Sequence, residues 1–96
     1  MTIERAYNLA EELSELLGNP AIDRLLKVLH NFVYYHDATE EQLKSAVESC
    51  EEISKSYANK LDYYICSLIG ACMKFGYNPL AIQDIRYFAN EINKME

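Results

Sequence analysis

The sequence predicts an all-α fold, a compact bundle of four to five helices built from αα-hairpins. Glycine and proline are scarce, with 3 and 2 residues in a chain of 96, whereas a β-sandwich needs a turn about every ten residues. Apolar residues recur at intervals of three and four, which is the spacing of one helix face. A chain of this length forms one modest hydrophobic core. We therefore expect a single helical domain over residues 1–96.

The first αα-hairpin is predicted from the residues that typically begin and end helices. Apolar residues with helical spacing cover 3–17, with Thr2 placed to cap the beginning of this helix and Gly18 at the left-handed position that follows it. Asn19 and Pro20 suit the N-cap and the first position of a second helix. The second helix is expected to bury an apolar stripe of Ile22, Leu25, Leu26, Leu29, Phe32 and Val33.

A capping box of Thr39 and Gln42 predicts where the next helix begins. No glycine or proline follows before Gly70, so one helix over 40–75 would be about 54 Å long. A compact domain of this size is only about 25–30 Å across. Either the helix breaks near residues 58–61, or it protrudes and a second copy buries it in a dimer. We favour the break.

Residues 61–75 are apolar nearly all round the predicted helix, which requires burial on most sides. They form either the central helix of the bundle or a dimer interface, and we expect a homodimer through this region. After Gly76, Asn78 and Pro79 repeat the earlier capping pattern and predict the beginning of the last helix. The buried stripe of that helix is predicted to contain Ile82, Ile85, Phe88, Ala89 and Ile92.

Composition argues against several classes of function. The formal net charge is −6 and the 9 basic residues are scattered, so direct binding to nucleic acid or to an anionic membrane is not expected. No apolar stretch reaches the roughly 18 residues of a membrane span, and we expect no signal peptide. The 3 cysteines are typical of free thiols in a cytoplasmic protein. No cofactor or metal is expected, since no metal-ligand spacing, phosphate loop or catalytic triad is visible.

One pair of residues suggests an enzymatic alternative. Arg24 and His30 have an R-x5-H spacing that resembles the Rx4–6H element of the HEPN superfamily, whose members are all-α. The resemblance implies a metal-independent RNase in which Arg24 and His30 act together across a dimer. On one helix the two side chains point about 120° apart, so His30 borders the apolar stripe while Arg24 faces solvent. The structural interpretation is a boundary histidine and a surface arginine.

Negative charge gathers in one part of the chain. Residues 37–59 contain six acids and two lysines, and Glu41, Glu48 and Glu52 share one helix face. Such a face is either simply solvated, with Glu51 and Lys55 paired four residues apart along the helix, or it docks on a basic partner and speeds its capture.

The chain has 8 tyrosines and no tryptophan. Two adjacent pairs occur at 34–35 and 63–64, and neighbouring helical residues point about 100° apart, so one member of each pair lies nearer the surface. Tyrosine is enriched at binding hot spots because it combines apolar area with a polar tip. The predicted partner-binding residues are Glu41, Glu48, Glu52, Tyr35 and Tyr63.

These features together predict a small acidic protein-binding module of the inhibitor, immunity or adaptor type, without enzymatic activity. It would occlude a basic, nucleic-acid-facing surface of a partner protein. The HEPN-like RNase is the alternative, and a purely structural helical dimer is the second alternative.

Overall fold

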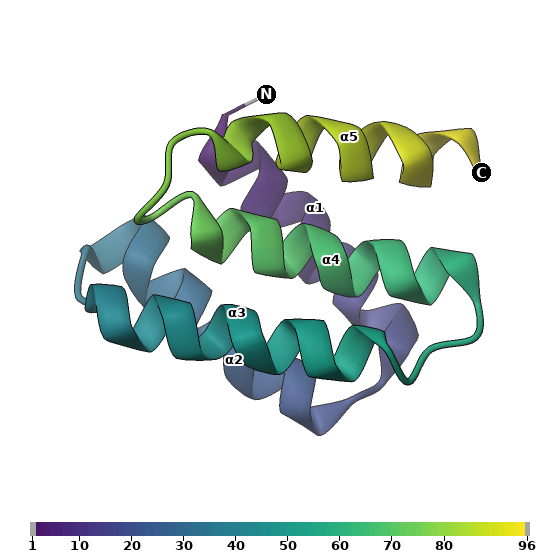
Figure 1. The fold of residues 1–96 in the computed structure, drawn as a ribbon, viewed down its shortest axis with the longest axis horizontal. Helices are drawn as coiled ribbons and strands as arrows, with labels where there is room; N and C mark the ends of the chain where they lie inside the picture. The colour runs from purple at the N-terminus through teal and green to yellow at the C-terminus, as the bar shows by residue number, and fades with distance from the viewer. Residues whose placement is uncertain (1, 96) are drawn as a thin grey trace.

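A computed structural model describes residues 2–95 and confirms the predicted all-α bundle. Its elements are α1 (Ile3–Leu17), α2 (Pro20–His30), the π-helical segment η1 (Asn31–Tyr35), α3 (Glu40–Ser54), α4 (Lys60–Lys74) and α5 (Ala81–Lys94). α3, α4 and α5 lie side by side in one layer, and α1 and α2 lie behind it (Figure 1). None of these helices is long and apolar enough to cross a membrane.

The predicted capping residues set the boundaries of the first hairpin. Thr2 accepts a hydrogen bond from the backbone amide of Arg5 at 3.2 Å. Gly18 follows α1 with a φ of 58°, a left-handed conformation that favours glycine. Asn19 caps α2 by accepting from the amide of Ala21 at 2.9 Å. The predicted capping box at the beginning of α3 is also present.

The chain breaks between α3 and α4, so one helix over 40–75 does not form. α3 ends at Ser54, and the Asn59 side chain caps α4 by accepting from the backbone amide of Leu61 at 2.8 Å. An asparagine N-cap satisfies an amide that has no partner inside the helix. α3 and α4 therefore run antiparallel (Figure 1), each with 15 residues. The predicted break is confirmed.

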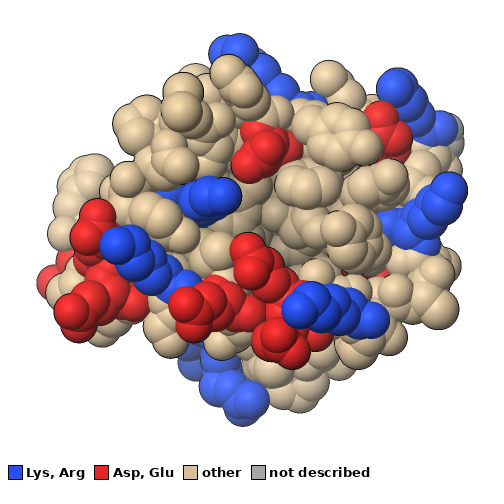
Figure 2. All heavy atoms as spheres, viewed as in Figure 1, with Lys and Arg blue, Asp and Glu red and all other residues tan. Residues whose placement is uncertain are grey.

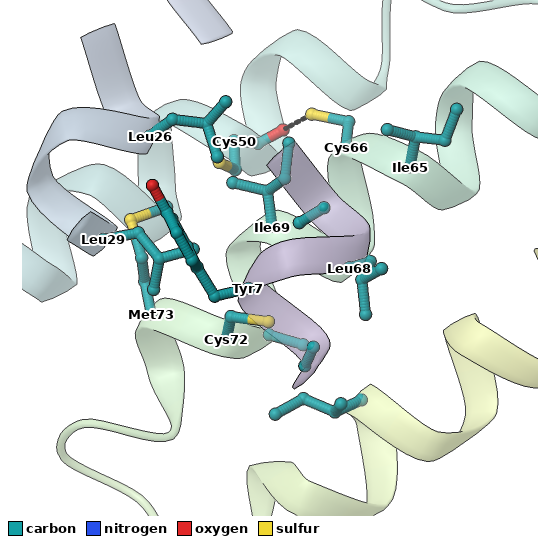
Figure 3. Close-up of a cluster of buried hydrophobic side chains, with 14 of the residues drawn as sticks. Tyr7, Leu26, Leu29, Cys50, Ile65, Cys66, Leu68, Ile69, Cys72 and Met73 are labelled. Atoms are coloured by element: carbon teal, nitrogen blue, oxygen red, sulfur yellow. Dashed lines mark hydrogen bonds between the residues drawn. The ribbon is translucent and has the colours of Figure 1, made fainter. Parts of the chain in front are cut away.

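α4 is the central helix of the bundle, which explains why its sequence is apolar nearly all round. It packs against α3 and α5 on its two sides and against α1 and α2 behind. Figure 3 shows its side chains among those of Tyr7, Leu26 and Leu29. Its buried residues are Ile65, Cys66, Leu68, Ile69, Gly70, Ala71, Cys72 and Met73. These residues are buried by their own chain, and the homodimer predicted from them stays a prediction.

The last helix begins later than the sequence indicates. Asn78 accepts a hydrogen bond from the amide of Leu80 at 3.1 Å, but Pro79 and Leu80 form a turn and α5 begins at Ala81. Bonds between residues three apart tighten this turn, so Pro79 precedes α5 instead of occupying its first position. The predicted stripe of α5 is buried or half-buried: Ile82, Ile85, Phe88, Ala89 and Ile92.

η1 continues the second helix and carries both a buried side chain and exposed ones. Val33 is buried, whereas Tyr34 and Tyr35 are exposed. η1 ends at Tyr35, and the next residue, His36, has a left-handed φ of 53°. The predicted stripe of the second helix therefore spans α2 and η1.

Candidate functional site

The three predicted glutamates line one groove between α2 and α3. Glu48 and Glu52 line a hollow of about 530 Å³, and Glu41 lines an adjoining hollow of about 390 Å³. The linings of the two hollows share Leu25, Ser45 and Ser49. We call the two hollows together the acidic groove.

The apolar pattern of α3 sets the direction of these carboxylates. Leu43, Val47 and Cys50 are buried, and their spacing fixes the inner face of the helix. The three glutamates fall on the exposed side. From α2, half-buried Leu25 and Val28 line the same groove. The acidic groove therefore combines carboxylates on one wall with an apolar floor.

Little positive charge offsets these carboxylates. Arg24 of α2 is the one basic residue of the described chain that lines the acidic groove. Glu41 and Glu48 form no ion pair with any residue of 2–95. A cationic group that enters the groove thus meets two carboxylates, Glu41 and Glu48, without a preformed partner, whereas Glu52 already pairs with Lys55.

The ion pair at the end of α3 differs from the one that the sequence spacing predicts. An i,i+4 spacing predicts a pair between Glu51 and Lys55, but Lys55 pairs with Glu52 at 3.3 Å. The chain tightens here to bonds between residues three apart, at Ser56 and Tyr57, which brings i,i+3 neighbours closer. Both side chains of the observed pair are well exposed, so it contributes about 0–1 kcal/mol to stability.

The negative field of α3 extends beyond the groove to Tyr77. Burial raises the pKa of the Tyr77 phenol. Three carboxylates of α3 raise this pKa further because they disfavour the phenolate, namely Glu51, Glu48 and Glu40. Figure 2 shows carboxylates gathered along α3 at the lower part of this face, with basic residues beside them. A partner that approaches α3 therefore meets a negative potential.

The two predicted tyrosines lie away from the acidic groove. Tyr35 is 68% exposed, and its ring packs edge-on against His30 with the ring centroids 5.5 Å apart. Tyr63 is 40% exposed and lines a separate hollow of about 390 Å³ among α3, α4 and α5, together with Phe88. The structure therefore brings the three glutamates together but not the tyrosines with them.

Arg24 and His30 line different grooves of the chain. Arg24 lines the acidic groove, whereas His30 lines a hollow of about 440 Å³ between α1 and α2. The hydroxyl of Tyr7 lies 3.1 Å from Nδ1 of His30, a contact that the sequence pattern did not reveal. The RNase alternative therefore depends on a second copy to bring an arginine and a histidine together.

Thiols and carboxylates do not gather into a metal site within residues 2–95. No group of three or more His, Cys, Asp or Glu residues there is placed to hold a metal ion. Cys50, Cys66 and Cys72 are buried and free, and the thiol of Cys66 donates to the carbonyl oxygen of Cys50 at 3.2 Å (Figure 3). The cysteines therefore serve as small core residues.

Sequence reasoning missed the residues that shape the acidic groove. Leu25 and Val28 from α2 and Ile53 from α3 supply its apolar lining, and this pairing depends on how the two helices pack. Ser45 and Ser49 lie one turn apart on α3 between the glutamates. Small residues within an acidic face are a pattern visible in the sequence, and they mark where the groove is open.

Comparisons of the chain with protein-family models, with curated proteins and with solved structures find no match. The function is therefore inferred from the geometry and charge of the acidic groove itself.

Proposed function

We propose that the chain is a small acidic protein-binding module of the inhibitor, immunity or adaptor type, which uses the acidic groove to occlude a basic surface of a partner protein. The observation that supports this most directly is that Glu41, Glu48 and Glu52 line one groove with a single arginine. Carboxylates on one wall speed the capture of a cationic surface. The apolar floor adds the desolvated contact that a lasting complex needs.

The test compares two double variants in the capture of partners from source-cell lysate with the tagged chain. Glu48→Lys/Glu52→Lys reverses two charges of the acidic groove, and Glu4→Lys/Glu12→Lys reverses two exposed charges of α1. Each substitution adds +2, so both variants change the formal net charge from −6 to −2. The two variants therefore have the same net charge and differ in where the charge is reversed, and the groove variant also loses the ion pair between Lys55 and Glu52.

We expect the wild-type chain and the α1 variant to capture a stoichiometric basic partner at low salt and to lose it at high salt. With the purified partner, the groove variant should associate about tenfold more slowly and with a weaker dependence on salt, as measured by surface plasmon resonance. Equal association rates for the two variants would contradict the proposed function.

A further inference from the structure

The acidic groove has a length and a lining that suit the binding of one helix. From Glu41 to Glu52, α3 rises about 16 Å, or three turns. The middle of this wall carries Ser45 and Ser49, whose small side chains let a neighbouring backbone approach. Leu25 lines both hollows. Grooves between side-chain ridges of helices accept the ridges of another helix.

The spacing of the carboxylates favours a helical occupant over an extended one. Glu41 and Glu48 are separated by about 10 Å along the axis of α3, and Glu48 and Glu52 by about 6 Å. A helix that lies along α3 has the same rise, so cations seven and four residues apart on one of its faces meet these carboxylates. In an extended segment, 10 Å corresponds to about three residues, and the two cations would point to opposite faces.

The two walls of the groove differ in charge, and this difference determines which face of a bound helix points to each wall. The α3 wall carries the three glutamates, whereas the α2 wall carries Arg24. A helix in the groove gains by directing its cations toward α3 and its apolar stripe toward Leu25 and Ile53. A cation directed at Arg24 would be repelled, and such repulsion contributes to specificity.

We propose that the acidic groove binds a single cationic amphipathic helix of the partner. Its Lys or Arg side chains, four and seven residues apart, face α3, and its apolar stripe packs on the floor of the groove. This inference rests on the proposed function, because the same groove is the binding surface, and it adds the kind of segment that the groove accepts.

Two synthetic peptides test the helical occupant. One is a helix of leucine, alanine and lysine, with lysines four and seven residues apart beside a leucine stripe. The other has the same composition in scrambled order, which keeps the charge and removes the stripe. Fluorescence anisotropy should show that the amphipathic peptide binds at least about tenfold more tightly, a ratio worth about 1.4 kcal/mol. Amide NMR shifts should change along α2 and α3.

Three variants distinguish a peptide that fills the groove from a peptide that is held only by attraction between charges. Ser49→Leu adds bulk to the middle of the groove at an exposed position, and we expect it to weaken binding at least about tenfold. Asn90→Leu makes a similar change at an exposed position of α5 and should leave binding unchanged. Arg24→Gln removes the one cation of the groove and should tighten binding about threefold at low salt.

Equal affinity for the two peptides, or unchanged affinity of the Ser49→Leu variant, would overturn the helical occupant. Neither result would bear on the proposed function, which is tested by the charge dependence of partner capture. Conversely, if the Glu48→Lys/Glu52→Lys variant captures the partner as fast as the α1 variant does, the proposed function is overturned even where the peptide binds. A circular dichroism spectrum of each variant establishes that it is folded.

Discussion

At the residue scale, the core holds a thiol whose ionisation opposes folding. Cys72 is fully buried, and burial raises its pKa from 9.0 to about 12, because the thiolate would lose its hydration. A pKa that is raised in the folded state means that the folded chain binds the proton more tightly. This contribution to stability is complete below pH 9, and it is lost as the pH rises through 9 toward about 12.

We therefore predict that Cys72→Ala makes stability less dependent on alkaline pH. The free energy of unfolding of the wild-type chain should fall above pH 9 by up to about 1.4 kcal/mol per pH unit more than that of the variant. Urea unfolding followed by circular dichroism measures both slopes. Ile65→Val, which removes a buried methyl group and keeps the thiol, is the control and should fall in parallel with the wild-type chain. Parallel curves for all three proteins would contradict the prediction.

The residue scale also shows what a sequence leaves open at a site. Glu41, Glu48 and Glu52 could be grouped in advance because they lie on one helix, where the helical period fixes their relative direction. Tyr35 and Tyr63 lie on other elements, and their distance from the glutamates depends on how those elements pack. The local pattern predicted that one tyrosine of each adjacent pair lies nearer the surface without identifying which one, and it did not place either residue relative to the acidic groove.

At the element scale, the close approach of α3 and α4 depends on Gly70. A Cβ atom at this position would lie 3.2 Å from the Cβ of Cys50, which is tighter than ordinary contact. The Cys50 Cβ is attached directly to the backbone of α3, so it cannot rotate away. Relief would require the two helices to separate, although α4 packs against α1, α2 and α5 as well.

We predict that Gly70→Ala destabilises the chain although alanine is the better helix former. The gain in helix propensity is about 1 kcal/mol, whereas overpacking of a core costs about 1–3 kcal/mol, so a net loss of about 1 kcal/mol is expected. Urea unfolding measures it. Ser67→Ala, on the same helix and lining an open hollow, is the control and should change stability little. A more stable Gly70→Ala variant would show that the helices move apart easily.

Element boundaries could be predicted where a side chain caps its own helix. Thr2, Asn19 and Thr39 bond to amides two or three residues ahead, so short-range pattern is sufficient to find them. The beginning of α5 was missed because Asn78 and Pro79 support a turn of i,i+3 bonds as well as a helix. The break between α3 and α4 was predicted for a different reason, because an unbroken helix would be too long for a compact domain. The cap at Asn59 was not identified from the sequence.

At the scale of the whole molecule, the chain is as compact as one folded domain of its length. Its Cα radius of gyration is 11.9 Å, close to the roughly 12.5 Å expected for one domain of this length. α4 is enclosed by four other helices of the same chain. The apolar surface that suggested a dimer is therefore already buried without a second copy.

We accordingly predict that the thermal midpoint of unfolding changes little over a hundredfold range of protein concentration. A structure whose folding required two copies to share α4 would show a midpoint that rises steeply with concentration, because association stabilises the folded state by mass action. Calorimetry together with light scattering distinguishes the two cases, and a steep rise would favour the purely structural dimer. A midpoint independent of concentration would mean that one chain buries its own core. The exposed wall of α3 is then not needed for folding, and the acidic groove is available to a partner.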